Sequence, residues 1–448
     1  MIAMNNLLCQ TKSSPRLVFA VLLMISFGVP GLYAEEETVL PQKESSQLKM
    51  HHSSDFGWAA DQDVTADLAK LLESGKLKAG DELVLDHTYR ISGTHELPDD
   101  FTLSAKKGAG FEVTDAKTNG RPLLELGNQT TLHNLTIIYM NTPELGGRSY
   151  KHGLDFFDKC GISTSGKSSI LIENCRLEGM ISQHIRLSNC KQPKVIGCHI
   201  IGGFWSVTIS GKDLVFQRCL FEKSCCDCIK GGADGALVEN CVFQDTCRDG
   251  IDTTGGLNNA VIRNCVFRRL GCCGLDLKSH YEGALGRPEN VGILIEKCLF
   301  SDMPNAVVLT TLDHRRRKQG KDQLTAANMK KYAPHDININ DCAFGYVEKP
   351  LLPSKKGGYG VDYPTEEGEH MRLILLKDAY GIRYRDARLF GDQIKPVLIH
   401  SIGGSKALSK EAADAIDRGV TGNILDEPAP PIEPGVTEVP FACGPQAE

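Results

Sequence analysis

The chain has 448 residues, of which 41% are hydrophobic and 24% charged, as in an ordinary soluble globular protein. Its net charge of -6 argues against general nucleic-acid binding, which needs a basic face. With only 2 Trp, the sequence is also a poor candidate for a module that stacks sugars on aromatic rings. The length suits two or three ordinary domains or one long array of repeats.

The first 34 residues have the pattern of a signal peptide. Lys12 and Arg16 supply positive charge, and residues 17–30 form an apolar run shorter than the ~18 residues that span a bilayer. Small residues then precede an acidic stretch at residues 35–37. We predict cleavage after residue 34 and a secreted or periplasmic protein without a later transmembrane segment. An uncleaved membrane anchor is the alternative.

The next segments predict a linker and then the start of a repeat array. Residues 35–62 are polar and are expected to form a linker. Residues 63–72 have the pattern of an amphipathic helix with an acidic or Thr start. Such a helix would cap the open N-terminal end of a solenoid. Short strands are expected at residues 82–85 and 101–103.

From residue 169 to residue 344 one phrase recurs: an apolar–x–apolar triplet, two polar residues, a cysteine and a further apolar pair. Successive cysteines are separated by 23, 21, 22, 24, 33 and 44 residues, which indicates a period near 22 with inserted loops. The apolar residues alternate with period two and are β-branched or aromatic, which excludes a helical repeat. The repeated cysteines are Cys175, Cys198, Cys219, Cys241, Cys265, Cys298 and Cys342.

Parallel strands of adjacent coils would stack ~4.8 Å apart, so equivalent residues should form columns. The seven cysteines should then form one internal ladder. We interpret it as a stack of small buried hydrophobic residues and not as metal or disulfide sites, because no His or carboxylate accompanies it. Residues 371–376 and 382–389 are expected as later strands. The array is predicted for residues 63–400, and residues 401–448 form an extension with a Pro-rich tail.

The sequence resembles the pectate-lyase-like superfamily of right-handed parallel β-helices over residues 63–345. Residues 80–85 and 89–93 are similar to the opening coils of its members, and the Asn-Cys-x-Phe phrase is similar to their repeat. The resemblance implies an all-β, right-handed parallel β-helix solenoid with an N-terminal capping helix. It leaves the activity open, because this scaffold carries lyases, hydrolases, esterases, epimerases and non-catalytic proteins.

The second strand of each coil carries charged residues in an unusual arrangement. At the position after an inward-pointing apolar residue, consecutive coils place polar side chains that should form one exposed column. Three more charged residues flank this column. The column is Arg186, Thr208, Lys230, Asp252 and Asp276, and the flanking residues are Asp227, Asp249 and Lys278.

Carboxylates on neighbouring coils repel each other, so some positive charge must compensate them. A hard cation such as Ca²⁺ takes several oxygen ligands, and the four aspartates Asp227, Asp249, Asp252 and Asp276 could supply them. A flanking lysine could compensate instead, which would leave a solvated charged face in which Lys230 simply pairs with Asp252. The sequence leaves both interpretations open.

The longest insertions, at residues 141–159, 278–290 and 311–334, border the same coils. Insertions in a solenoid form loops beside the binding face. The last insertion is basic, which suits an anionic polysaccharide, although a basic loop without a partner is an equal alternative. The predicted substrate-binding residues are Arg186, Arg248, Arg315 and Arg316.

Residues 248–252, Arg-Asp-Gly-Ile-Asp, resemble family nine of the polysaccharide lyases, in which an Asp-Asp-Gly-x-Asp phrase helps to bind Ca²⁺. The resemblance implies ligand roles for Asp249 and Asp252, and Asp227 matches a further carboxylate. Arg248 stands in place of the family's first Asp. The family's base is a lysine in a later Gly-Phe-Lys-Leu phrase, where this chain has Asp276 and carries Lys278 two residues on.

We therefore predict an exported, monomeric enzyme acting on a uronate-containing polysaccharide by β-elimination. Calcium would neutralise the uronate carboxylate, and Lys278 or Lys230, with a lowered pKa, would remove the adjacent proton. A glycoside hydrolase with Asp252 and Asp276 as acid and base is the second enzymatic alternative. A non-catalytic glycan-binding or structural β-helix is the competing class.

A second group of cysteines precedes the candidate site on three successive coils. They lie off the ladder column, so a different explanation is needed. Cross-coil disulfides or plain burial are expected, and a zinc site is the alternative. The group is Cys225, Cys226, Cys228, Cys247, Cys272 and Cys273.

Overall fold

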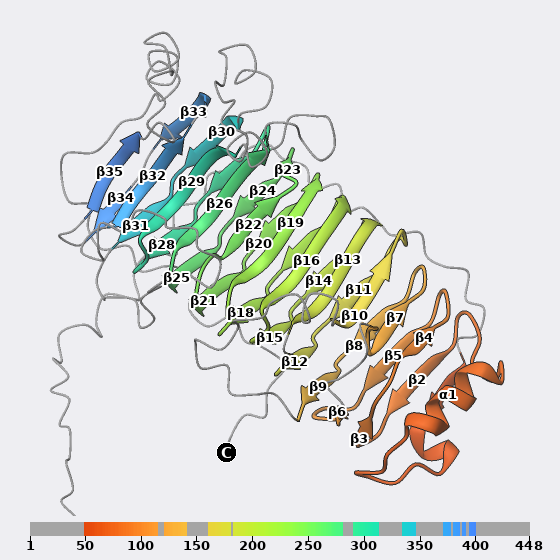
Figure 1. Ribbon diagram of the computed structural model, residues 1–448. Coiled ribbons are helices and arrows are strands. Elements are labelled where there is room, and N and C mark those ends of the chain that lie inside the picture. The colour runs from red at the N-terminus through yellow and green to blue at the C-terminus, as the bar shows by residue number, and fades with distance from the viewer. Residues whose placement is uncertain are drawn as a thin grey trace, which may run out of the picture.

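The computed structural model describes residues 49–114, 121–140, 160–180, 182–280, 290–312 and 334–345, and the backbone of four later strands between residues 371 and 399. The described chain winds into an elongated stack of coils (Figure 1). Three sheets run along the stack, two of 12 strands and one of 11, and neighbouring strands pair in parallel. Within these residues, no helix has the length and apolar character required to cross a membrane.

Each coil contributes one strand to each sheet, in the order sheet 1, sheet 3, sheet 2. Sheet 1 consists of β1 (Met50–His52), β2 (Glu82–Leu85), β5 (Thr102–Ala105), β8 (Thr131–His133), β11 (Leu171–Glu173), β14 (Lys194–Ile196), β17 (Val215–Gln217), β20 (Leu237–Glu239), β24 (Val261–Arg263), β27 (Leu294–Glu296), β30 (His335–Asn340) and β33 (Tyr380–Arg385).

Sheet 2 contains the longest strands and carries the candidate column. It consists of β4 (His95–Leu97), β7 (Leu124–Leu126), β10 (Cys160–Ser165), β13 (Gln183–Lys191), β16 (Trp205–Lys212), β19 (Asp227–Asp234), β22 (Ile251–Thr254), β26 (Cys273–His280), β29 (Asn305–Leu312), β32 (Met371–Lys377) and β35 (Ile394–Ile399), with β23 (Leu257–Asn258) beside β19.

Sheet 3 completes the coil. It consists of β3 (Thr88–Ile91), β6 (Gly110–Val113), β9 (Thr136–Tyr139), β12 (Arg176–Glu178), β15 (His199–Ile201), β18 (Leu220–Glu222), β21 (Val242–Thr246), β25 (Val266–Leu270), β28 (Leu299–Ser301), β31 (Ala343–Gly345) and β34 (Arg388–Phe390).

The N-terminal end of the stack is closed by α1 (Thr65–Glu73), which buries Leu68 and Leu71 against the first coil (Figure 1). Within the described residues, regular structure begins earlier than we predicted. Residues 50–56 of the expected linker form β1, which pairs with β2, and the short 3₁₀ helix η1 (Ser53–Phe56). The segment is polar because it lies at the rim, where one face of the strand stays exposed.

The corner between sheets 1 and 3 is made by a single residue in the left-handed conformation, directly before each ladder cysteine. Asn174, Asn240 and Asn264 occupy this corner with φ between 53° and 54°. Asparagine tolerates this conformation better than most non-glycine residues. The recurring Asn-Cys phrase thus encodes a turn followed by a buried residue.

The core is built from columns of identical side chains. The ladder cysteines are all at most 2% exposed, and each thiol donates to the carbonyl oxygen two residues earlier, as Cys241 does to Glu239 at 3.3 Å. The prediction of a buried, apolar ladder is confirmed. Next to it, the rings of Phe221, Phe243, Phe267 and Phe300 stack with centroids 4.7–4.9 Å apart.

Candidate active site

In sheet 2, the strands pair in the register that places the residues of the predicted column side by side. Arg186 pairs with Thr208, Thr208 with Lys230, and Lys230 with Asp252. Asp252 then pairs with Asp276. The apolar residues that precede them, such as Ile229 and Ile251, are buried inside the solenoid, so the period of about 22 residues places these side chains above one another, as predicted.

The predicted exposure of the column is wrong for its acidic members. Asp252 and Asp276 are 0% exposed, and so are the flanking residues Asp227 and Asp249. Alternation along a strand determines which face a side chain points to, but it does not determine what covers that face. We use "charge cluster" for the buried aspartates and the basic side chains that contact them: Asp227, Lys230, Arg248, Asp249, Asp252, Asp276 and Lys278.

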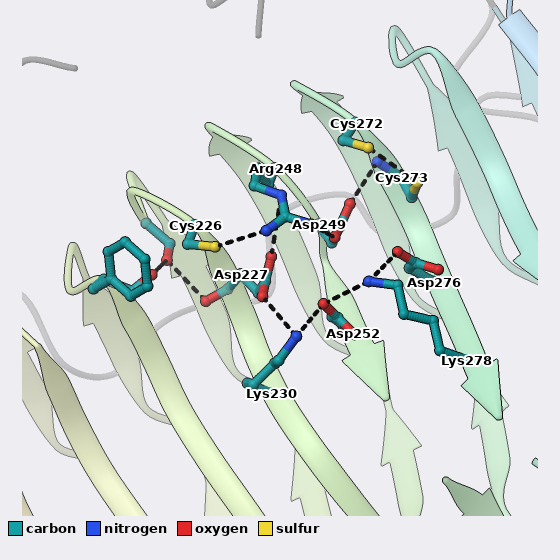
Figure 2. A network of polar contacts seen from close by, with 12 residues as sticks. Cys226, Asp227, Lys230, Arg248, Asp249, Asp252, Cys272, Cys273, Asp276 and Lys278 are labelled. Atoms are coloured by element: carbon teal, nitrogen blue, oxygen red, sulfur yellow. Dashed lines mark hydrogen bonds and ion pairs between the residues drawn. The ribbon is translucent and has the colours of Figure 1, made fainter. Parts of the chain in front are cut away.

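Two lysines bridge the carboxylates of the charge cluster (Figure 2). The ammonium group of Lys230 contacts Asp252 Oδ2 and lies 3.5 Å from Asp227 Oδ2. The ammonium group of Lys278 lies 2.9 Å from Asp252 Oδ2 and 2.5 Å from Asp276 Oδ2. Lysines and aspartates therefore alternate along three neighbouring strands, and Asp252 is shared by both lysines.

Arg248 closes the other side of the cluster, in the turn before β22. Its Nη2 lies 3.4 Å from Asp249 Oδ2, its Nε lies 4.0 Å from Asp227 Oδ1, and its Nη1 donates to Cys226 Sγ at 3.3 Å. The backbone N–H of Cys273 donates to Asp249 Oδ1 at 3.0 Å. Asp249 is thus held by Arg248 of its own coil and by Cys273, the first residue of β26 in the next coil (Figure 2).

The two aspartates of the Asp-Gly-Ile-Asp phrase have opposite pKa shifts. Burial raises the pKa of Asp249 to about 8, with the charges of Asp227 and Asp276 acting in the same direction and Arg248 opposing. Burial also acts on Asp252, but Lys278 and Lys230 outweigh it and lower its pKa to about 2.

Lys230 is held in its charged form. Burial acts to lower the pKa of Lys230, but the carboxylates of Asp227 and Asp252 outweigh it and raise it. A general base must be unprotonated, so this environment opposes the catalytic role that the sequence suggested for Lys230. Lys278, the other predicted base, is held between Asp252 and Asp276.

Three of the four predicted calcium ligands lie together, and Asp276 is not among them. Oxygens of Asp227, Asp249 and Asp252 fall within 4.8 Å of one another, and both oxygens of Asp227 are buried without a hydrogen bond. However, the ammonium and guanidinium groups already lie within 4.0 Å of these carboxylates and would repel a dication. The residues present fit compensation by lysine better than calcium, and calcium stays a prediction.

Residues 127–285 match the family described as right handed beta helix region, which agrees with the three parallel sheets. The chain has the fold of the pectate-lyase-like right-handed parallel β-helices. No curated protein matches the sequence significantly. The solved structures that resemble this β-helix are distant in sequence, so their likeness shows the fold alone.

Three of these structures represent different activities. The mannuronan C-5 epimerase A-module of Azotobacter vinelandii is 9% identical, covers 84% of this chain and 99% of its own, and has a TM-score of 0.53. The polygalacturonase of Erwinia carotovora is 12% identical over 77% of this chain and 97% of its own, with a TM-score of 0.51. The surface protein and adhesin PfbA of Streptococcus pneumoniae is 11% identical over 78% and 100%, with a TM-score of 0.50.

The β-helix also brings two residues to the site that the sequence did not single out. Trp205 pairs with Asp227 on one side and Gln183 on the other, and its ring centroid lies 6.0 Å from the ammonium group of Lys230. Gln183 Oε1 accepts from Thr208 at 2.6 Å and from Arg186 at 3.3 Å. Trp205 is one of 2 Trp in the chain and lies three positions before the column. These two facts were the signal by which the sequence could have pointed to it.

Of the predicted substrate-binding residues, the structure brings Arg248 into the charge cluster. It places Arg186 on the same column, three coils before Asp252. Arg315 and Arg316 lie outside the described residues.

The second cysteine group lies at the turns before the cluster, as expected. None of the described cysteines is in a disulfide. Cys272 Sγ lies 3.3 Å from Cys273 Sγ, and both thiols fall within 4.8 Å of an Asp249 oxygen. Cys226, Cys228, Cys272 and Cys273 are buried, whereas Cys225 and Cys247 are partly exposed.

Proposed function

We propose that the chain is an exported enzyme that cleaves glycosidic bonds in an acidic, uronate-containing polysaccharide, with the charge cluster as its active site. The fold alone does not choose this function, because the similar structures include an epimerase, a polygalacturonase and an adhesin. Export is supported by the N-terminal pattern of charge and apolar residues. The choice of substrate is supported by the outward position of the basic groups in the charge cluster. The choice of reaction is supported by the pKa shifts of its aspartates.

The cluster presents its positive groups outward. Lys230, Arg248 and Lys278 keep 19%, 14% and 10% of their side chains exposed, whereas their aspartate partners are 0% exposed. A ligand that approaches therefore meets ammonium and guanidinium groups first. These groups form strong charge-assisted hydrogen bonds to carboxylates, which favours a sugar that carries a carboxylate. Arg186 extends the positive strip by two coils.

The observation that carries the proposal is the closeness of Asp249 and Asp252, two buried carboxyl groups whose surroundings shift their pKa values in opposite directions. Their pKa values are about 8 and about 2, and their nearest oxygens lie within 4.8 Å. Two carboxyl groups whose pKa values are pushed apart are typical of an acid and a nucleophile or base. Sequence reasoning named a different pair, Asp252 and Asp276, because it could not detect the shift of Asp249.

In this mechanism, Asp249 gives its proton to the glycosidic oxygen as the bond to the anomeric carbon breaks. The carboxylate of Asp252 attacks that carbon, and water then releases the sugar while Asp249 takes back a proton. A uronate carboxylate that binds Lys230 and Lys278 would compete with Asp252 for them, and thereby free it to react.

Elimination, the activity predicted from the sequence, is the second candidate. It is favoured by the gathering of three basic side chains, which could neutralise a uronate carboxylate and acidify the neighbouring proton. It would also require one lysine to lose its proton between two carboxylates. We rank it second because the raised pKa of Lys230 opposes that step.

The test is an assay of the full-length purified protein on polygalacturonate, alginate and glycosaminoglycans, with two readouts. Hydrolysis raises the number of reducing ends without ultraviolet absorbance, whereas elimination produces both. Asp249→Asn and Asp252→Asn should each lower the rate by about 10³-fold. Asp245→Asn is the matched control, because Asp245 pairs with Arg269 at 2.6 Å on sheet 3. Tight binding without any product would overturn the proposal in favour of a non-catalytic protein.

A further inference from the structure

Cys225 and Cys247 lie opposite each other in the two turns that lead into the charge cluster. The backbone N–H of Cys247 donates to Ser224 O at 3.0 Å, and that of Arg248 donates to Cys226 O at 3.1 Å, so the two turns are stacked. The side chain of Cys225 lowers the pKa of the Cys247 thiol, which places the two side chains next to each other. Each cysteine stands two residues before a cluster aspartate, Asp227 or Asp249.

Exposure distinguishes this pair from every other cysteine that the structure describes. Cys225 and Cys247 are partly exposed, and the remaining thirteen of the fifteen described cysteines are buried. The ladder cysteines are stacked on adjacent coils as well, but they are sealed in the core and donate to backbone carbonyls. A dissolved oxidant can therefore reach the pair without unfolding of the solenoid.

We propose that Cys225 and Cys247 form a cross-coil disulfide when the protein meets an oxidising environment. Neighbouring parallel strands are ~4.8 Å apart, within the ~4.4–6.8 Å between Cα atoms that a disulfide accepts. This assigns one pair among six cysteines for which the sequence left disulfide, burial and metal binding open. It does not depend on the proposed catalytic activity.

A small disulfide such as oxidised glutathione is the oxidant. One cysteine thiolate attacks its S–S bond. This step joins the protein to one glutathione in a mixed disulfide and releases the other glutathione as a thiolate. The second cysteine attacks the protein-bound sulfur and releases the second glutathione. The protein thus loses two protons and two electrons, and one oxidised glutathione becomes two reduced ones.

The bond would fasten the two turns that position Asp227 and Asp249. It closes a loop of 22 residues between positions 225 and 247, which restricts the unfolded chain. Because the joined turns belong to adjacent coils, the bond would also hold the coils in register at the cluster. The oxidised protein should therefore resist heat better than the reduced protein.

The test begins with the purified full chain, incubated with oxidised or with reduced glutathione and then alkylated without reduction. Peptide mapping by mass spectrometry should find one linked pair, Cys225 with Cys247, with the buried cysteines unlinked. The melting temperature should rise by about 5–10 °C on oxidation. Cys225→Ser and Cys247→Ser should each remove the rise, and the double variant should remove no more.

Cys226→Ser is the matched control, since Cys226 is adjacent in sequence but buried. It should retain both the linked peptide and the rise on oxidation. The proposal is overturned by linkage through Cys226, Cys228, Cys272 or Cys273, by glutathione attached to one cysteine without closure of the pair, or by the absence of any linked peptide.

Discussion

The cysteine ladder and the charge cluster are produced by the same device, a residue placed at one register position of consecutive coils. They differ in the kind of partner that each polar atom finds. Each ladder thiol contacts backbone carbonyl oxygens, as Cys265 contacts those of Arg263 in its own coil and Val238 in the preceding coil. Each cluster carboxylate depends on charged side chains, as Asp252 does on Lys230 and Lys278. Backbone partners stay in place when a neighbouring side chain changes, whereas side-chain partners make the cluster a set of interdependent groups.

Removal of Asp252 should have the largest effect on stability. Asp252→Ala leaves the ammonium groups of Lys230 and Lys278 without their shared, fully buried partner, and the loss of a buried pair costs ~3–5 kcal/mol. Chemical denaturation measures the change. Asp245→Ala breaks an ion pair that is partly exposed and should cost less than ~1 kcal/mol. Equal costs for the two variants would mean that the cluster behaves as a solvated surface.

The pH dependence of stability separates Asp249 from Asp252. Asp249 has a pKa raised from 3.8 to about 8, so its contribution is full below pH 3.8 and is lost as the pH rises through about 8. The pKa of Asp252 is lowered to about 2, so its contribution is present above pH 3.8 and is lost as the pH falls towards 2.

Asp249→Asn should therefore become more stable relative to the wild type as the pH rises from 5 to 9, and Asp252→Asn should lose relative stability from pH 2 to 4. Urea unfolding across this range measures both trends. Parallel stability curves for wild type and Asp249→Asn would show that Asp249 is ionised throughout and cannot act as the acid.

Gly274 lies beside the phenylalanine stack of the core and belongs to β26, the strand that carries Asp276 and Lys278 of the charge cluster. A Cβ on Gly274 would lie 2.6 Å from a ring carbon of Phe300 and 2.7 Å from the carbonyl oxygen of Ala306. Gly274→Ala should therefore destabilise the protein by ~1–3 kcal/mol. Combination with Phe300→Leu, which removes the obstructing ring, should cost less than the two single changes added together. Strict additivity would contradict this packing.

The ladder should respond weakly to loss of one thiol. Cys241→Ala removes one buried sulfur and should cost about 1 kcal/mol, since the neighbouring coils keep their own hydrogen bonds. Thermal unfolding of Cys241→Ala and Cys265→Ala, alone and combined, measures whether ladder positions are independent. A loss comparable to that of Asp252→Ala would remove the contrast between the ladder and the cluster.

Metal removal should have the smallest effect. Because the lysines already compensate the aspartates, a chelator should change neither the melting temperature nor the rate of polysaccharide cleavage. Titration of Ca²⁺ into chelator-treated protein measures both. A calcium-dependent gain in either quantity would restore the calcium site that the Asp-Gly-Ile-Asp phrase suggested.

The fold was accessible from the sequence because its signal is repeated. The spacing of Cys219, Cys241 and Cys265 gave the period, and the period gave the pairing of Lys230 with Asp252. Such register information is local and accumulates over many coils. It is sufficient to predict that the column residues lie beside one another.

The burial of the site residues and the groups that neutralise them could not be predicted from the sequence in the same way. Whether Asp252 is covered, and whether Lys230 or a metal neutralises it, depends on the reach of long side chains from neighbouring coils. The pKa of Asp249 depends on burial and on charges from Asp227 and Asp276, which no spacing reveals. Trp205 was missed for a related reason, since it gains meaning only from its pairing with Asp227.

The regular register of the coils gives this protein an adjustable length. Because Lys194 and Val215 occupy equivalent points at the starts of β14 and β17, removal of one turn, residues 194–214, would join equivalent points and leave the other coils intact. The strand β13 would then meet β19, and Arg186 would stand beside Lys230. The distance from Arg186 to Asp252 can therefore change in steps of one coil, ~4.8 Å, so insertion or deletion of a turn is a route by which this scaffold can be fitted to ligands of different lengths.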